Sequence, residues 1–230
     1  MKKKALIAGI ATVPILALCA IIKLPQLMPH PTIPAHDIAE YLQDGDIICR
    51  LGDRLWSTYF KDISPMDKRF SHLGIARIAD GKITVINAEG RAIEGKDLVN
   101  ETDLDEFLAI AKAIGIYRLQ DLDGKTLSTA AMDYIGYPFD WSFDLQDDTK
   151  LYCTELLYAV LKKTAPEIQL QTIFQKELNK EIMPLEAVSN SAFFKEVAYI
   201  RIDYDSKPES TLILGRNRTP IQPVYTPLKN

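Results

Sequence analysis

Cysteine and histidine are scarce in this chain of 230 residues. The cysteines form no Cys-x-x-Cys pair, and the histidines lack the spacing of metal ligands. Both absences argue against a zinc site and a disulfide framework, so we expect no metal and no cofactor. Cys49 and Cys153 could in principle form a bridge, but a nucleophilic cysteine must stay free, and we expect free thiols at both. The residues concerned are Cys19, Cys49, Cys153, His30, His36 and His72.

A basic excess, an internal repeat and a glycine-rich phosphate loop are also missing. The formal net charge is −4, which gives no reason to expect a nucleic-acid partner. The content of 47% hydrophobic and 25% charged residues is that of a soluble globular domain. About 170 residues remain once the terminal segments are set aside, enough for one domain with its own core.

The first 24 residues have the pattern of an export signal. A basic start at Lys2–Lys4 precedes an uncharged run, Ala5–Ile22, of about eighteen residues. We expect an uncleaved signal anchor, then in order of preference a cleaved signal peptide and a lipid on Cys19, where Leu18 departs from the lipobox pattern. Each alternative places the rest of the chain on the periplasmic side of the cytoplasmic membrane.

Residues 25–34 carry four prolines and predict a stiff spacer. We assign residues 35–205 to one catalytic domain and residues 206–230, which are polar and rich in proline, to a mobile tail. Within the domain, residues 169–179 are predicted to be helical.

A hairpin brings polar residues toward His72. Residues 71–78 and 82–89 read as strands around the two-residue turn Asp80-Gly81. Antiparallel pairing then joins residues whose numbers sum to about 161, so that His72 faces Glu89 and lies diagonally to Asn87. Either side chain could orient the imidazole, and the alternative for His72 is an ordinary histidine at a strand end.

Cys153 begins a predicted helix. The apolar residues Leu156, Leu157, Val160 and Leu161 follow it at helical spacing. In a first helical turn the unpaired N–H groups and the helix dipole favour a thiolate, which predicts a thiol pKa below the usual value. A buried structural cysteine is the alternative.

Cysteine hydrolases combine a thiol, a histidine and a polar residue that orients the histidine. Cys153, His72 and Asn87 or Glu89 supply this set, with the cysteine after the histidine, the reverse of the order in papain. Six motifs within about residues 44–200 occur in a recognisable order: Gly45-Asp46-Ile47-Ile48, Ser71-His72-Leu73-Gly74, Ile86-Asn87-Ala88-Glu89-Gly90, Gly136-Tyr137-Pro138-Phe139-Asp140-Trp141-Ser142-Phe143, Tyr152-Cys153-Thr154-Glu155 and Ile182-Met183-Pro184-Leu185-Glu186. In these motifs the chain resembles the permuted papain-like cysteine hydrolases of the YiiX/YaeF type, related to NlpC-type cell-wall peptidases.

The resemblance implies a circularly permuted papain-like α+β fold, with a small antiparallel sheet packed on the cysteine-bearing helix. It implies Cys153 as nucleophile, His72 as general base and an acyl-thioester intermediate. The family often has glutamate at the third position, where the register here places Asn87, and Glu89 could substitute. We expect an envelope-facing peptidase or amidase acting on a peptide, amide or lipid-like substrate. The alternatives are a lipid acyltransferase or thioesterase with the same site, and a catalytically silent module tethered to the membrane.

Overall fold

The computed structural model of the protein describes residues 32–91, 96–203, 210–214 and 220–224. The described residues belong to one compact unit. Its helices are α2 (Ala35–Ala39), α3 (Leu55–Ile63), α4 (Leu104–Leu108), α5 (Gly124–Met132), α6 (Cys153–Thr164) and α7 (Glu186–Ser189). Its strands are β1 (Ile47–Gly52), β2 (His72–Ala79), β3 (Lys82–Arg91), β4 (Lys96–Asp103), β5 (Ala111–Leu119), β6 (Ile173–Gln175), β7 (Lys180–Ile182), β8 (Phe194–Asp203), β9 (Ser210–Leu214) and β10 (Pro220–Val224).

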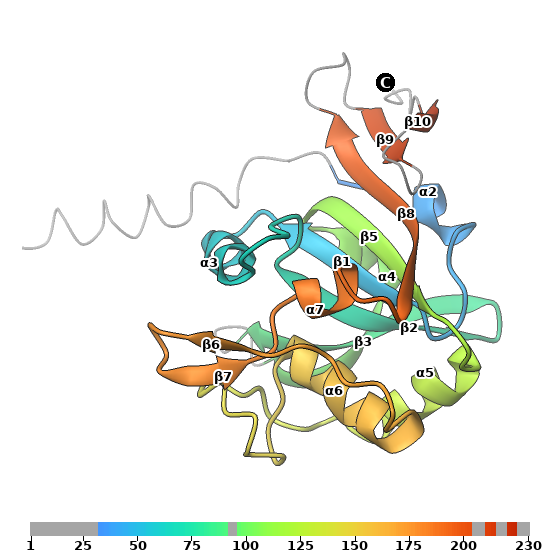
Figure 1. Ribbon diagram of the computed structural model, residues 1–230. Coiled ribbons are helices and arrows are strands. Elements are labelled where there is room, and N and C mark those ends of the chain that lie inside the picture. Colours follow the sequence, from blue (N-terminus) through green and yellow to red (C-terminus); the bar gives the residue numbers. More distant parts are fainter. Residues whose placement is uncertain (1–31, 92–95, 204–209, 215–219, 225–230) are drawn as a thin grey trace, which may run out of the picture. The chain divides into compact units, whose positions relative to one another are not determined.

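An antiparallel sheet forms the centre of the fold (Figure 1). Its eight strands follow the order β10-β9-β8-β5-β1-β2-β3-β4, so β1 and β2 are interior strands. The hairpin of β2 and β3 has the predicted register, with Ala79 opposite Lys82 and Ile75 opposite Ile86. This register determines which side chains of β3 can reach the start of β2.

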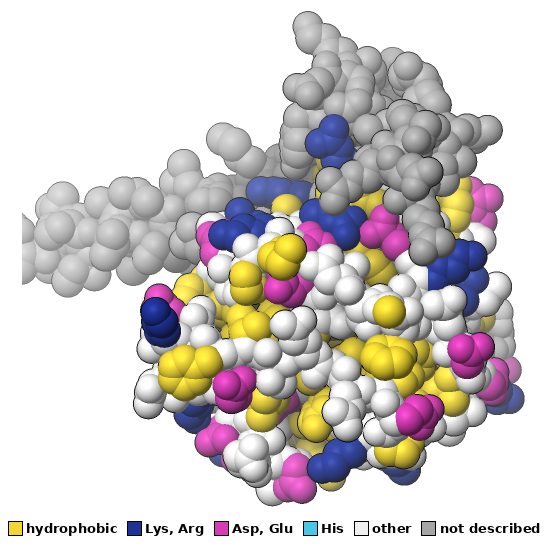
Figure 2. Space-filling view, viewed as in Figure 1, with side chains coloured by type: hydrophobic (Ala, Val, Ile, Leu, Met, Phe, Trp, Pro, Cys, Tyr) yellow, Lys and Arg dark blue, Asp and Glu magenta, His cyan; other side chains and the backbone are white. Residues whose placement is uncertain are grey.

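Each face of the sheet has its own hydrophobic core, because side chains alternate along a strand. On one face Ile47, Cys49 and Leu73 pack in a core that includes the apolar residues of α5 and α6. On the other face Ile48 and Ala76 pack in a second core with residues of α2 and α4. The face of the unit seen in Figure 2 exposes scattered hydrophobic side chains among acidic and basic ones.

The predicted fold class is confirmed, and the sheet is larger than the small one expected. The helix predicted over 169–179 is wrong, because β6 and β7 form a separate two-stranded hairpin there. Asn179, at the turn, has a positive φ of 53°, a conformation that asparagine tolerates better than most residues. The segment predicted as a tail contains β9 and β10, which extend the sheet beyond β8 and which the sequence analysis missed.

The predicted signal segment at 1–24 lies outside the described residues. Within the ranges that the structure describes, no helix is both long and apolar enough to cross a membrane.

Candidate active site

Cys153 is the first residue of α6, as its position in the sequence predicts. The backbone N–H of Tyr152, immediately before it, donates to Glu155 Oε2 at 3.0 Å, which satisfies a polar group at the helix start. The apolar stripe behind the cysteine is completely buried, and it packs α6 on the sheet. The hydrogen bond at the helix start and the packing of its apolar residues together hold Cys153 in place at the start of α6.

Burial dominates the electrostatics of the Cys153 thiol. It raises the pKa to about 11, and the backbone N–H groups of Leu73 and Thr154 and the charge of Arg50 lower it only in part. The expected lowering of this pKa is therefore wrong, because desolvation of the sulfur outweighs the helix start. With a raised pKa, the thiol must lose its proton in order to become a nucleophile.

His72 is the first residue of β2, and its ring lies close to the polar residues of β3. The Nε2 atom is 3.0 Å from Asn87 Oδ1 and 3.8 Å from Glu89 Oε1. On one side the ring packs against Phe107 of α4, with ring centres 5.8 Å apart. Asn87 is therefore the hydrogen-bonding partner of the imidazole, whereas Glu89 acts on it through charge at longer range.

The amide of Asn87 can be oriented in one way only. Its Nδ2 atom lies 3.3 Å from the Val85 carbonyl oxygen, which can only accept, and 3.1 Å from Thr102 Oγ1. Asn87 is fully buried, so both amide ends need protein partners. The Oδ1 atom consequently faces the imidazole and requires a proton on His72 Nε2, so Nδ1 is the basic nitrogen of the neutral ring.

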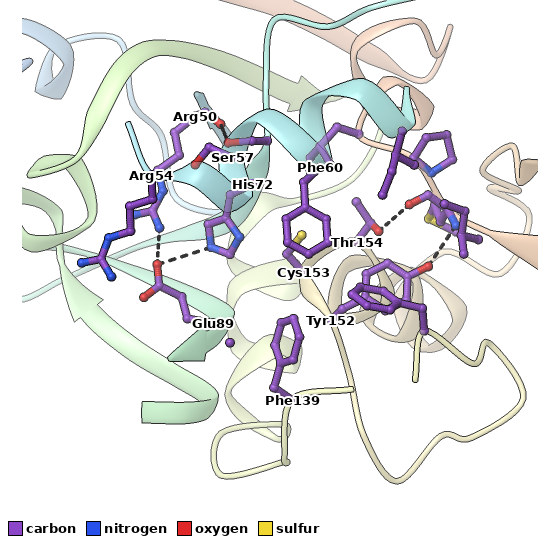
Figure 3. Close-up of a pocket in the computed structure, with 18 of the residues that line it drawn as sticks. Arg50, Arg54, Ser57, Phe60, His72, Glu89, Phe139, Tyr152, Cys153 and Thr154 are labelled. Atoms are coloured by element: carbon purple, nitrogen blue, oxygen red, sulfur yellow. Dashed lines mark hydrogen bonds and ion pairs between the residues drawn. The ribbon is translucent and has the colours of Figure 1, made fainter. Parts of the chain in front are cut away.

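Glu89 is held mainly by an arginine. Arg50 of β1 forms a buried ion pair with Glu89 Oε1, donates from a second nitrogen to the Phe107 carbonyl oxygen at 2.6 Å, and stacks on the Phe107 ring at 4.2 Å. Figure 3 shows Glu89 between Arg50 and His72, with dashed lines to both. A buried cation thus compensates the carboxylate beside the imidazole.

One cavity of about 150 Å³ contains the thiol and the imidazole together. Its wall includes His72, Glu89 and Arg50 as well as Cys153. The sulfur lies beside the backbone N–H of Leu73, the residue that follows His72 in β2. The candidate residues Cys153, His72 and Glu89 therefore line the same cavity. Asn87 lies outside its wall and contacts the imidazole of His72.

Sequence reasoning missed two supporting residues, Arg50 and Thr102. Arg50 stands within the apolar run Ile47–Leu51, and a charged residue among apolar ones is a signal of a buried partner. Thr102 lies on β4, a strand that the sequence analysis did not predict, so no pattern linked it to Asn87.

The described part of the chain holds no group of three or more histidine, cysteine or acidic side chains arranged to bind a metal ion. We assign no residue as a metal ligand.

Comparison with known proteins gives one family and one fold. The family described as "permuted papain-like amidase enzyme, YaeF/YiiX, C92 family" matches residues 41–198, more than half of the chain. The solved structure of "metalloprotein yiiX" from Escherichia coli O157:H7 has 19% sequence identity and a TM-score of 0.56, and the match covers 67% of this chain and 95% of that one. No curated protein sequence matches. At this identity the structural likeness concerns the fold.

Proposed function

The chain belongs to the family of permuted papain-like cysteine amidases, and from this premise we propose that Cys153 carries the reaction through an acyl-thioester. The observation that carries the proposal is the pairing of a helix-start thiol with a histidine whose tautomer is fixed by a buried asparagine, in one cavity. A purely structural cysteine would not need this arrangement.

In the acylation step, His72 Nδ1 takes the proton of the thiol as the sulfur attacks the carbonyl carbon of the amide. The backbone N–H of Cys153 at the helix start donates to the oxygen that becomes negative. The His72 imidazolium then gives its proton to the leaving nitrogen, the C–N bond breaks, and the acyl group remains on sulfur as a thioester.

In the deacylation step, a water molecule gives a proton to His72 Nδ1 and attacks the thioester carbonyl carbon. The C–S bond breaks, the carboxylic acid leaves, and the proton returns to the sulfur. Asn87 keeps the ring in one orientation through both steps, because its Oδ1 accepts from Nε2 whether the imidazole is neutral or protonated.

Turnover of a fluorogenic anilide by four purified proteins tests this function. We expect Cys153→Ala and His72→Ala to lose hydrolysis. We expect Cys49→Ala, a change at the other buried free cysteine, to retain it. Hydrolysis that survives in Cys153→Ala would refute the mechanism.

A second candidate, thioester hydrolysis or acyl transfer from a lipid, shares the same acyl-enzyme. It is favoured by the apolar wall of the cavity beyond Cys153. The bond that is broken distinguishes the candidates, so anilides and thioesters with the same acyl group should be compared under the same conditions. Faster turnover of the thioester does not by itself identify the second candidate, because thioesters are intrinsically more reactive than amides. A failure to hydrolyse any amide would favour the second candidate.

We place this activity on the periplasmic side of the cytoplasmic membrane. The support is the sequence of residues 1–34: a basic start, a long apolar run and a proline-rich spacer. Fractionation should find the protein in the membrane, with the domain accessible to protease from the periplasmic side. Full-length protein in the soluble cytoplasm would contradict this location, and a diacylglycerol on Cys19 would replace the anchor with a lipid.

A further inference from the structure

We propose that Glu186 is a positioning residue for the reaction, because it holds residues 183–186 as a strap across the cavity that contains Cys153. The inference rests on the proposed function for the reaction that the strap assists. It adds a residue that takes no part in the proton transfers and that belongs to the motif Ile182-Met183-Pro184-Leu185-Glu186.

The first end of the strap is tied to the start of α6. The backbone N–H of Met183 donates to the Tyr152 hydroxyl at 2.9 Å, and the Met183 carbonyl oxygen accepts from Thr154 Oγ1 at 2.7 Å. Figure 3 shows these two hydrogen bonds as dashed lines from Tyr152 and Thr154. Met183 is buried, which shields both bonds from competition with water. The strap is therefore fixed to the two residues that precede and follow the nucleophile in the sequence.

The second end of the strap is tied to the turn that follows α3. Glu186 Oε2 accepts from the backbone N–H groups of Met66 and Asp67, each at 2.8 Å. Glu186 is buried, and hydrogen bonds from N–H groups to a carboxylate are roughly twice as strong as those between neutral groups. This one side chain thus joins the start of α7 to the end of α3.

The turn that Glu186 holds is also bound to the central sheet. Asp67 forms an ion pair with Arg69 at 2.7 Å. The Arg69 guanidinium donates to Glu196 Oε2 of β8 at 2.9 Å and to the Tyr117 hydroxyl of β5 at 3.0 Å. Because this network fixes the turn to the sheet, the bonds to Glu186 restrain the strap.

Between its two tied ends the strap forms part of the cavity wall. The wall is lined by Met183, Pro184 and Leu185 of the strap and by Phe60 and Ile63 of α3. The ring of Pro184 fixes its φ, so the short link between the tied ends has little conformational freedom. With both ends held, the strap sets the separation between α3 and the start of α6. It thereby sets the width of the space in which the scissile amide must lie.

Other contacts hold the groups that transfer protons. Cys153 is positioned by α6, and the imidazole of His72 by Asn87 of β3 at 3.0 Å. Release of the strap at Glu186 should therefore leave the thiol and the imidazole in place and loosen the fit of the substrate. The expected result is a higher KM with a nearly unchanged kcat, since the bound amide reacts with the same groups.

Steady-state hydrolysis of one anilide by variants of the full chain tests the assignment. Glu186→Ala removes the acceptor of both N–H groups, so KM should rise about tenfold while kcat changes less than about threefold. Glu186→Gln keeps an acceptor oxygen at the same reach, so KM should stay within about threefold of that of the unmodified protein. Glu181→Ala removes an exposed glutamate of β7 and should leave both constants unchanged.

A role of Glu186 in stability alone gives a different result. In that case Glu186→Ala lowers the folded fraction, so that the rate per total protein falls while KM stays the same, and this outcome would overturn the proposal. A KM in Glu186→Gln as high as that in Glu186→Ala would overturn it as well. If Glu186→Ala does not fold, Glu186→Asp takes its place, because the shorter carboxylate keeps its charge but cannot reach both N–H groups, and KM should again rise.

Alkylation of Cys153 tests the strap without turnover and separates it from the proposed function. At one pH, Glu186→Ala should raise the rate with a bulky N-arylmaleimide relative to that with N-ethylmaleimide, read at Cys153 by peptide mapping. If this ratio rises but no anilide is hydrolysed, the strap stands and the proposed function is wrong. If anilides are hydrolysed through Cys153 and Glu186→Ala changes neither KM nor the ratio, the function stands and the role of Glu186 is wrong.

Discussion

Replacement of Asn87 by alanine should reduce catalysis more than it reduces stability. The change removes the 3.0 Å contact that orients the imidazole of His72. A hydrogen bond to a group that becomes charged contributes about 1.5–3 kcal/mol, so kcat should fall roughly ten- to a hundredfold. The loss of the amide also leaves Thr102 Oγ1 without its donor, at a cost of about 1–3 kcal/mol in the free energy of unfolding.

Replacement of Glu89 by glutamine should have the opposite balance. It leaves Asn87 in place and removes one partner of the buried ion pair with Arg50, whose side chain is only 4% exposed. Removal of one partner from a buried ion pair costs about 3–5 kcal/mol, so the midpoint of thermal unfolding should fall further than in Asn87→Ala. We expect kcat to fall less than tenfold for the folded fraction.

The assay is anilide hydrolysis at a temperature where both variants are folded, normalised to the folded protein by circular dichroism. Asn87→Asp adds a third reading, because a carboxylate at Nε2 stabilises the imidazolium and should move the acid limb of the kcat/KM profile to higher pH. A larger loss of kcat in Glu89→Gln than in Asn87→Ala would show that Glu89 orients His72 and would refute this reasoning.

Two further predictions concern pH. Burial raises the pKa of Glu155 from 4.5 to about 8, so the folded protein binds this proton more tightly than the unfolded chain. This contribution to the free energy of unfolding is full below about pH 4.5 and is lost as pH rises toward 8. Glu155→Gln should reduce the change in the free energy of unfolding between pH 4.5 and 8, and identical pH profiles of the two proteins would contradict the assignment. Alkylation of Cys153 by iodoacetamide should increase with pH toward the thiol pKa of about 11, whereas a rate that reaches its plateau below pH 7 would indicate a preformed thiolate.

The elements nearest the site follow from local patterns. The turn Asp80-Gly81 determines the register of β2 and β3, and the apolar stripe behind Cys153 determines the face of α6. In contrast, β9 and β10 are stabilised by pairing with β8, a contact between segments that no local pattern encodes. The hairpin of β6 and β7 was missed because its apolar residues also fit a helical spacing over so short a length.

The sequence predicted only part of the candidate site, because the rest depends on contacts between distant segments. Hairpin geometry brought Asn87 and Glu89 within reach of His72 but could not choose between them. The choice depends on Thr102 and Arg50, which come from β4 and β1 and meet the hairpin only in the folded sheet. The thiol pKa was predicted in the wrong direction because a sequence shows the helix start and hides the depth of burial.

The central claim is that Cys153 forms an acyl-thioester, and intact-mass analysis of a rapidly quenched reaction tests it most directly. With an anilide that the protein hydrolyses, the protein should gain the mass of one acyl group, and peptide mapping should place it on Cys153. The adduct should be absent from Cys153→Ala and present in Cys49→Ala. Hydrolysis of the anilide with no adduct on Cys153, or an adduct on another residue, would contradict the account.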